Sequence, residues 1–596
     1  MIRTPLRPLA RILDARARGE NPDAIERENI RIRHEQMRDQ SRQRAEGRLL
    51  VLGMFFVAAF GIIGLRMGMM ATAEPMEPRV EAPGAAIHAA RAEIVDRHGR
   101  LLATNFETHA LYAQPPQMID PEHAVAELTR IFPDLDGARL LADFTGERKF
   151  VWIKRKISPE QLQAVHEIGE PGLLFGARDM RLYPNGRLAA HVLGGAGYGR
   201  EGVQAAEIIG VAGVEKYFDG YLRDPGNGAR PLALSLDLTV QAAAERVLAG
   251  GMALMNAKGA TSILMDVDTG EVVSVVSLPN FDPNNRPRPA VSGDPSDSPL
   301  FNRSVQGVYE LGSTFKIFTT AQALDLGLVN PGTIIDTKGP LRWGKHRIRD
   351  FRNYGDTLTV SKVIEKSSNI GTARIAQQIG AVRQRAFLKE MGMLDATGFE
   401  LIEAAGGKPL LPRNWSEIST MTISYGHGLS TSPMHLAAGY AAIANGGFKV
   451  KPTILKQDGP QLGPRLISDA SARASRQMLR RVVTDGTASF GEVKGYAVGG
   501  KTGTADKPRP QGGYYDEKVI ATFAAIFPAH DPKYVLIVTL DEPVDTIGDK
   551  PRRTAGWTAV PVAAEMIKRV APLLGLRPTV EPVVVTDIKL TQNESR

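Results

Sequence analysis

The chain has no cysteine, and only 6% of its 596 residues are aromatic. The absence of cysteine excludes disulfides, thiolate metal sites, cysteine nucleophiles and lipids attached to cysteine. There is no HExxH helix, and we predict no metal, no cofactor and no phosphate-binding loop. Charge of one sign is also not concentrated: 73 Lys and Arg against 65 Asp and Glu give a formal net charge of +8. Because the basic residues are spread widely and no zinc-finger or RNP-like pattern accompanies them, we expect no nucleic-acid partner.

Long apolar runs are scarce, with one exception near the N-terminus. Residues 49–65 are uninterruptedly apolar, and the weaker continuation to residue 73 gives enough length to cross a bilayer. The first 48 residues contain twelve Arg and no Lys against eight acidic residues. The positive-inside rule therefore places the N-terminus in the cytoplasm and the rest of the chain in the periplasm, outside an inner membrane crossed once. The Ala-Thr-Ala at residues 71–73 leaves a cleaved signal peptide as the alternative, although the long preceding region favours an uncleaved anchor.

The length exceeds what one hydrophobic core usually supports, so we expect two folded domains with accessory segments. Composition shifts and turn-rich stretches divide the chain into six parts. These are a basic cytoplasmic tail (1–48), a transmembrane anchor (49–73), a Pro-containing linker (74–84), an N-terminal folded domain (85–231), a second domain (232–575) and a loose tail (576–596).

The two domains differ in their pattern of elements. The first mixes short strand-like pieces with helical ones such as 121–132 and 158–169. The second begins with a strand and an Ala-rich helix, followed by a β-hairpin over residues 261–279 with Asp-Thr-Gly at its turn. Further strands are predicted around 496–505, 519–529 and 534–542. We therefore predict a mixed α/β fold in which an antiparallel sheet is covered by helices.

Three short motifs occur in order in the second domain: STFK at 313–316, SSN at 367–369 and KTGT at 501–504. A Ser followed three residues later by Lys on a helix places the hydroxyl and the amine on one face, so the amine can remove the hydroxyl proton. Ser313 is then the nucleophile and Lys316 its base. We expect Ser313 to lie at a helix N-terminus, where backbone amides favour an oxyanion.

The other two motifs supply groups that this chemistry needs. Lysine is a poor base at its ordinary pKa, so Lys316 requires burial or a neighbouring cation, and Lys501 is the candidate neighbour. Ser367 could pass a proton to the leaving group, and Asn369 could hold a substrate amide. A strand edge at KTGT would let an extended peptide lie close, with three more residues as substrate-binding candidates: Thr502, Gly503 and Thr504.

Each motif also has an ordinary structural interpretation. Ser313 could be an N-cap, a Lys near a helix start is usually solvated, and the two glycines before Lys501 could form a bulge. The three motifs in order make these coincidences improbable together. His191 and His427 lack metal-ligand spacing and are interpreted as structural histidines.

The same motifs occur in penicillin-binding proteins and related β-lactamases. The chain resembles a class B high-molecular-weight penicillin-binding protein along its whole length. RAEIVDRHGRLLA (91–103), RLYPNGRLAAHVLGGAG (181–197) and GVAGVEKYFDGYL (210–222) resemble the motifs of that class's dimerisation-type domain, here called the pedestal. The resemblance implies that four residues tie the pedestal to the transpeptidase domain: Arg91, Asp96, Arg181 and Glu215. One departure is Leu311, where the family usually has Pro.

The segments at 302–316, 424–447, 482–488 and 554–562 are most similar to the division-specific member of the class. The resemblance implies a D,D-transpeptidase that cross-links septal peptidoglycan through an acyl-enzyme on Ser313 and is blocked by β-lactams. The backbone amides of Ser313 and Thr504 would form the oxyanion hole. The implied partners are stem peptides of lipid-linked precursor or nascent glycan, a membrane-embedded glycan polymerase and division proteins.

Three alternatives remain open. The elongation-specific class B enzyme shares the same motifs. A β-lactamase shares the acylation chemistry, but no matching hydrolytic Glu motif is visible and an anchor with a pedestal would be needless. A non-catalytic division scaffold or β-lactam sensor would not need the complete set of motifs.

Overall fold

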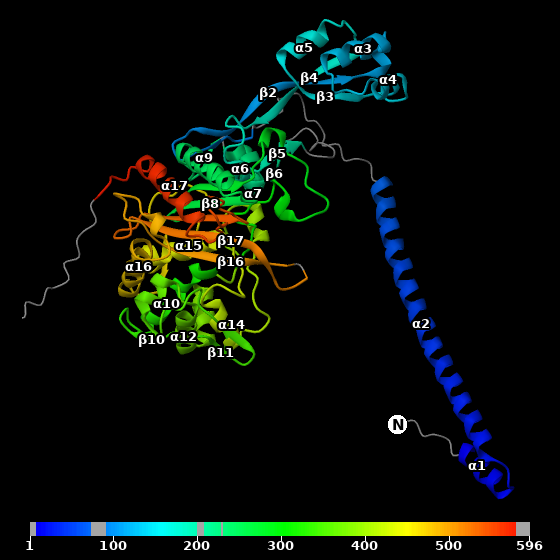
Figure 1. Cartoon of the computed structure of the whole chain (residues 1–596). Coiled ribbons are helices and arrows are strands. Elements are labelled where there is room, and N and C mark those ends of the chain that lie inside the picture. The colour runs from blue at the N-terminus through cyan, green and yellow to red at the C-terminus, as the bar shows by residue number, and fades with distance from the viewer. Residues whose placement is uncertain (1–6, 73–90, 199–207, 228–229, 510, 580–596) are drawn as a thin grey trace, which may run out of the picture. The chain divides into compact units, whose positions relative to one another are not determined.

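The computed structural model describes residues 7–72, 91–198, 208–227, 230–509 and 511–579 (Figure 1). The chain divides into two compact units, residues 1–88 and 89–596. The predicted linker (74–84) lies outside the described residues, as does most of the predicted tail (576–596).

The first unit consists of two helices, α1 (Arg7–Ala17) and α2 (Pro22–Thr72). Helix α2 runs for 51 residues through both the charged segment and the apolar run. Among the residues that the structure describes, no helix meets the combined length and apolarity needed to cross a membrane. The predicted membrane-spanning helix is therefore not confirmed.

The second unit begins with a sheet in the pedestal, in the order β3-β2-β1-β7 with β4 also paired to β2. Helices α3 and α5 begin where Asp120 and Ser158 accept hydrogen bonds from the first helical turns, and both have Pro at the start. The elements of this region, in chain order, are β1 (Ile94–Val95), β2 (Leu101–Ala113), α3 (Pro121–Ile131), α4 (Gly137–Thr145), β3 (Val151–Ile157), α5 (Pro159–His166), β4 (Leu173–Leu182), α6 (Ala190–Leu193), β5 (Gly195–Tyr198), β6 (Ile208–Ala212), α7 (Gly213–Tyr217), α8 (Asp219–Arg223) and β7 (Leu232–Ala233).

The centre of the remaining chain is a five-stranded antiparallel sheet in the order β16-β17-β18-β8-β9. Its strands are β8 (Gly259–Asp266), β9 (Val272–Leu278), β16 (Gly499–Pro508), β17 (Tyr514–Phe527) and β18 (Tyr534–Asp541). The inner strands are buried on both faces, which explains their nearly continuous apolar sequences. Among the described strands β16 pairs only with β17, so one edge of β16 has no neighbouring strand in this part of the chain.

Helices cover both faces of this sheet. On one face α9 (Leu238–Leu254) packs beside α17 (Ala559–Leu573), and on the other α15 (Pro433–Ala444) and α16 (Asp469–Thr484) pack against the strands, as Figure 1 shows. Beyond α16 lies a helical layer with small hairpins. Its elements are α10 (Lys316–Asp325), β10 (Ile334–Asp336), β11 (Leu341–Trp343), β12 (His346–Ile348), β13 (Thr357–Thr359), α11 (Val360–Lys366), α12 (Asn369–Ile379), α13 (Ala381–Glu390) and α14 (Glu417–Ile423). The short antiparallel pair β14 (Phe448–Val450) and β15 (Leu462–Arg465) lies beside α15 instead.

The mixed α/β fold with an antiparallel sheet covered by helices is thus confirmed. The predicted hairpin at 261–279 is the antiparallel pair β8–β9, and the three predicted later strands are β16, β17 and β18. The predicted helices at 121–132 and 158–169 are α3 and α5.

Candidate active site

Ser313 lies in a short 3₁₀ turn, Gly312–Phe315, directly before α10. This turn runs directly into α10, which begins at Lys316, so Ser313 lies at the N-terminal end of the helical path. Gly312 has a φ of +56°, a left-handed conformation that favours glycine and redirects the chain immediately before the serine. The serine and the lysine nevertheless remain three residues apart on one continuous helical path.

The turn is held in place by buried aromatic packing. Phe318 packs edge-on against both Phe315 and Tyr440, with ring centroids 5.4 and 5.5 Å apart. The Tyr440 hydroxyl donates a 2.8 Å hydrogen bond to the carbonyl of Thr314. Because these groups are almost fully buried, the backbone that carries Ser313 has little freedom to move.

The Lys316 side chain is buried and directed at Ser367. Its Nζ donates to the Ser367 carbonyl oxygen at 2.5 Å and to the Ser367 Oγ at 3.0 Å. Within the described residues no hydrogen bond joins Lys316 to Ser313. Burial lowers the pKa of Lys316 well below its ordinary value, and the nearby Lys501 lowers it further. A neutral amine has two N–H groups, so both are used on Ser367 and the lone pair stays available to a proton from Ser313.

The Ser367 hydroxyl accepts hydrogen bonds from both lysines. Ser367 ends α11 with a φ of +62°, a costly conformation for a residue other than glycine, which places its hydroxyl between the two amines. The Nζ of Lys501 donates to the Ser367 Oγ at 2.9 Å and to the Thr502 carbonyl at 3.0 Å. With both lone pairs of the Ser367 hydroxyl occupied, its own proton is left to be donated elsewhere.

Burial lowers the pKa of Lys501 to about 7. Near neutral pH this side chain therefore exchanges readily between its charged and neutral forms. The predicted grouping of Ser313, Lys316, Ser367 and Lys501 is brought together by the fold, although the four residues come from three distant segments.

Asp350 is a member of this site that the sequence analysis missed. Its carboxylate accepts hydrogen bonds from the Ser368 hydroxyl at 2.7 Å and from the backbone amides of Asn369 and Ile370 at 2.5 and 3.0 Å. It thereby fixes the start of α12, and its charge opposes the lowering of the Lys316 pKa. A single Asp in a polar loop has no motif around it, so nothing in the sequence singled it out.

Asn369 is positioned by the same loop. Its side-chain amide donates to the carbonyl of Arg349 at 3.0 Å, and the side chain is only partly buried. This hydrogen bond therefore fixes the orientation of the Asn369 side-chain carbonyl as well.

The residues of the KTGT segment do not share one face, because side chains alternate along β16. Lys501 points to the lysine–serine group, whereas the Thr502 hydroxyl lies 2.7 Å from that of Thr487. The Thr504 hydroxyl accepts a hydrogen bond from the Ala555 amide at 3.0 Å. Thr502 and Thr504 therefore share the face of β16 opposite to that of Lys501, and both stay predicted substrate-binding residues.

Gly503 allows close packing between β16 and the serine turn. A Cβ at this position would lie 2.3 Å from the Leu311 carbonyl oxygen. From the other side, a Cβ on Gly312 would lie 3.3 Å from the backbone nitrogen of Thr504. The backbone around Ser313 and that around Thr504 are therefore in direct contact, which is the arrangement that a two-amide oxyanion hole requires.

Residues 495–502 spell a phosphate-loop pattern, GYAVGGKT, so the prediction that no such pattern exists needs correction. In a phosphate-binding loop this pattern precedes a helix. Here residues 499–502 are part of β16, and the Lys501 amine is buried against Ser367. The match to the pattern therefore does not describe a nucleotide site.

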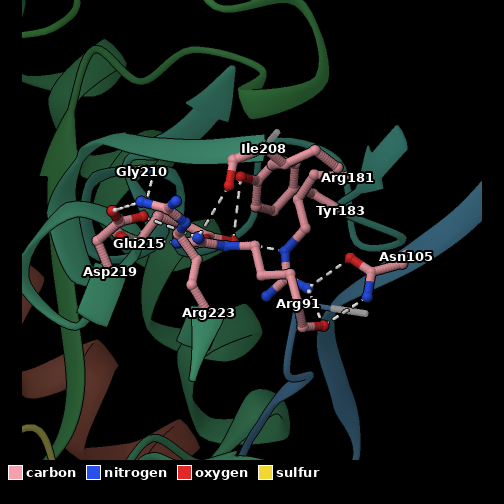
Figure 2. Close-up of polar contacts among 9 residues, drawn as sticks. All are labelled: Arg91, Asn105, Arg181, Tyr183, Ile208, Gly210, Glu215, Asp219 and Arg223. Carbon is pink, nitrogen blue, oxygen red and sulfur yellow. Dashed lines mark hydrogen bonds and ion pairs between the residues drawn. The ribbon is translucent and has the colours of Figure 1, made fainter. Parts of the chain in front are cut away.

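Three of the four predicted pedestal residues, Arg91, Arg181 and Glu215, form a buried ionic cluster (Figure 2). Glu215 is fully buried, and its two carboxylate oxygens each lie 2.7 Å from an arginine, Arg91 and Arg181. Arg91 also pairs with Asp219 at 2.8 Å. These residues all lie within the pedestal range, so the cluster joins pedestal segments to one another.

Asp96 instead bridges the predicted domain boundary. Its carboxylate pairs with Arg100 at 2.6 Å and accepts a hydrogen bond from the Leu238 amide at the start of α9. Arg100 also forms an ion pair with Asp237 at 2.8 Å. Of the four pedestal residues, Asp96 is the one whose own hydrogen bonds cross to the sequence beyond residue 231.

Comparison with known protein families gives two matches that cover most of the second unit. Residues 260–568 match the penicillin binding protein transpeptidase domain, and residues 86–229 match the penicillin-binding protein dimerisation domain. The chain belongs to the class B penicillin-binding proteins.

Curated relatives of this class cover most of the chain. It is 33% identical over 513 residues to the probable peptidoglycan D,D-transpeptidase FtsI of Caulobacter vibrioides, covering 84% of each protein. It is 30% identical over 488 residues to the peptidoglycan D,D-transpeptidase FtsI of Escherichia coli, covering 77% of this chain and 80% of the relative.

A solved penicillin-binding protein shares the fold. Penicillin-binding protein 3 of Mycobacterium tuberculosis, in complex with aztreonam, superposes with a TM-score of 0.62 at 25% identity. The match covers 83% of this chain and 98% of that structure. The observed sheet with its helical layers is therefore the fold of a penicillin-binding protein.

Proposed function

We propose that this protein is a peptidoglycan D,D-transpeptidase that cross-links stem peptides during septal cell-wall synthesis and is inhibited by β-lactams. The observation that carries the proposal is the convergence of two buried lysines on one hydroxyl, Ser367 Oγ, beside the turn that presents Ser313. The D,D-transpeptidase names of the relatives agree with it.

In the first half-reaction Ser313 Oγ attacks the carbonyl carbon of the penultimate D-alanine, and its proton moves to the neutral amine of Lys316. The backbone amides of Ser313 and Thr504 stabilise the oxyanion. When the peptide C–N bond breaks, the departing amine takes the free proton of Ser367, which is replaced from one of the two lysines. The products are an acyl-enzyme and D-alanine.

In the second half-reaction an amine from a neighbouring stem peptide attacks the acyl carbon and restores Ser313. The unpaired edge of β16 supports binding of the donor peptide as an added strand. A β-lactam would enter as a cyclic amide, and because its leaving group stays attached, Ser313 remains blocked.

The chemistry is tested by labelling the full chain in detergent with a fluorescent penicillin and locating the adduct by peptide mass spectrometry. We expect a long-lived adduct on Ser313 and none in Ser313→Ala. Rapid turnover of the penicillin would instead support a β-lactamase, and labelling that survives in Ser313→Ala would contradict the proposal.

The cellular role is tested with Ser313→Ala as the sole copy. Loss of septation would support the septal role, whereas lateral-wall defects would favour the elongation-specific alternative. Full growth and cross-linking with a stably folded variant would favour a scaffold or a β-lactam sensor.

The membrane anchor (49–73), the six-part domain division and the partners are part of the proposal. The apolar run and the outward apolar side chains of α2, such as Phe55 and Ile62, support an anchor with the catalytic domain in the periplasm. Such an anchor would place the enzyme beside a membrane-embedded glycan polymerase and division proteins. Carbonate extraction of membranes and the mass of the mature N-terminus test whether the segment is retained.

A further inference from the structure

A second polar cluster is formed by Glu310, His427 and Tyr514 and is not used in the mechanism above. Glu310 lies three residues before Ser313 in the sequence. The Glu310 carboxylate lies 2.9 Å from the Nδ1 of His427 and accepts hydrogen bonds from the Gly428 amide at 2.7 Å and from the Tyr514 hydroxyl at 3.1 Å. The Tyr514 hydroxyl is also 3.3 Å from the Nε2 of His427. The sequence predicted His427 to be an isolated structural histidine, and the structure gives it an acidic partner.

This cluster joins three segments that form the site. Glu310 belongs to the strand-like approach to Ser313, His427 to the loop after α14, and Tyr514 to the start of β17. The loop after α14 also touches the serine turn directly, because the Gly312 amide donates to the Gly426 carbonyl at 3.2 Å. A shift of this loop would therefore move the backbone next to the nucleophile.

The geometry satisfies a doubly protonated imidazole. Nδ1–H can donate to Glu310, and Nε2–H can donate to the Tyr514 oxygen while the Tyr514 proton goes to Glu310. A neutral His427 would lose its charge, and with it the ion pair, and also one of these two donors. The other charged or titratable groups that face the cluster are Tyr425, whose ring stacks near His427, Asp506 on β16 and Asp516 on β17.

The pKa of His427 also favours the doubly protonated imidazole. The Glu310 carboxylate raises the pKa of His427 above its ordinary value, and Asp506 adds to the effect. The contribution of the ion pair is present at low pH and is lost as the pH rises through this raised value.

We propose that Glu310 is a positioning residue for acylation, which acts through His427 and Tyr514 to hold the loop after α14 and the β16–β17 hairpin against the Ser313 turn only while His427 is protonated. The inference rests on the proposed function, since acylation of Ser313 is the reaction that it modulates. It gives the enzyme a dependence on external pH that is separate from the titration of the two lysines.

The test compares the second-order rate constant for acylation by a fluorescent penicillin between the wild-type full chain and three variants, from pH 5.5 to 9. Glu310→Gln keeps the shape and an acceptor for Gly428 but cannot pair with a charged His427. His427→Gln removes the titrating group. The matched control is His98→Gln, which breaks another histidine–carboxylate contact, to Asp237 in the pedestal network.

We expect the wild-type to Glu310→Gln rate ratio to be about 10 at low pH, where His427 is charged, and to approach 1 at high pH. His427→Gln should give the same profile, and His98→Gln a ratio near 1 throughout. Since the lysines are common to all variants, their titration cancels in the ratio.

A ratio that is the same at every pH would show a merely structural role and would overturn the proposal, as would unchanged rates in both cluster variants. Should Glu310→Gln fold poorly, Tyr514→Phe provides the second variant. We expect it to lower the acylation rate constant by a smaller factor, within the same low-pH range. Absence of labelling at Ser313 in the wild type would instead contradict the proposed function, so the two failures are distinguishable.

Discussion

The Nζ of Lys316 lies 3.0 Å from the Oγ of Ser367 and makes no hydrogen bond to Ser313 among the described residues. In this structure the proposed general base is therefore held by the residue proposed to protonate the leaving amine, not by the proposed nucleophile. Hydrogen bonds to a reacting group are often long in a ligand-free enzyme and tighten when substrate binds. The arrangement leaves the Lys316 lone pair without a hydrogen-bond partner until substrate binds and Ser313 reacts.

This relationship makes Lys316→Arg a specific test of the base. Arginine keeps a positive charge and can donate to Ser367, but it cannot lose a proton near neutral pH. We expect acylation by fluorescent penicillin to fall by about 10²- to 10⁴-fold, the usual contribution of a general base. Rates within a few-fold of wild type, with the melting temperature unchanged, would rule out Lys316 as the proton acceptor.

The lowered pKa of Lys501 makes a prediction about stability. In the unfolded chain this lysine titrates near its ordinary value, whereas in the folded protein burial lowers its pKa to about 7. Between these two values the unfolded state binds more protons, so the free energy of unfolding rises with pH across this window.

We therefore compare wild type with Lys501→Met by urea unfolding at pH 7, 8 and 9. The stability difference should shift in favour of wild type by up to about 1.4 kcal/mol per pH unit, because methionine does not titrate. Because Lys501 also lowers the pKa of Lys316, its replacement raises that pKa, and the Lys316 contribution changes in the same direction. A difference that does not depend on pH would mean that Lys501 keeps an ordinary pKa in the folded protein.

Asp350 acts on the pKa of Lys316 in the direction opposite to burial and Lys501, and this can be tested. Its negative charge raises the pKa of Lys316, opposing burial and Lys501. Asp350→Asn keeps the amide-accepting oxygen but removes the charge. We expect the acidic limb of the acylation rate profile to move to lower pH, by less than about one unit because the site is also shaped by burial. Asp336→Asn, at an exposed pair with Arg374, serves as the control and should leave the limb unmoved.

How far the sequence predicts this site depends on the type of information involved. Ser313, Lys316, Ser367 and Lys501 carry motifs with fixed local spacing, and the hydrophobic pattern predicts the strands that bring them together. The apolar alternation at 261–279 and the runs at β17 and β18 are sufficient for the sheet because burial selects one register. The class of fold and the family follow from these features.

Other features depend on contacts between distant segments, which no local pattern specifies. Asp350 acts through amides 19 and 20 residues away, and Glu310 meets His427 across 117 residues of sequence. The 3₁₀ turn that carries Ser313 likewise depends on a left-handed Gly312 and on buried aromatic packing with Tyr440.

The buried pedestal cluster leads to the last prediction. Glu215 is fully buried and pairs with Arg91 and Arg181 at 2.7 Å each, so its removal would take a carboxylate partner from both arginines, although Arg91 keeps its pair with Asp219. Breaking a buried pair in this way typically costs about 3–5 kcal/mol. We expect Glu215→Ala to lower the free energy of unfolding of the second unit by this amount.

The matched control is Glu565→Ala, which breaks an exposed pair with Arg569 on α17. Exposed pairs contribute at most about 1 kcal/mol, so this variant should unfold almost as wild type does. Both are measured by urea unfolding and by limited proteolysis, which reports the pedestal separately. Equal effects of the two substitutions would mean that the Glu215 cluster is solvated in the protein, and the cluster would then contribute little to holding the pedestal segments together.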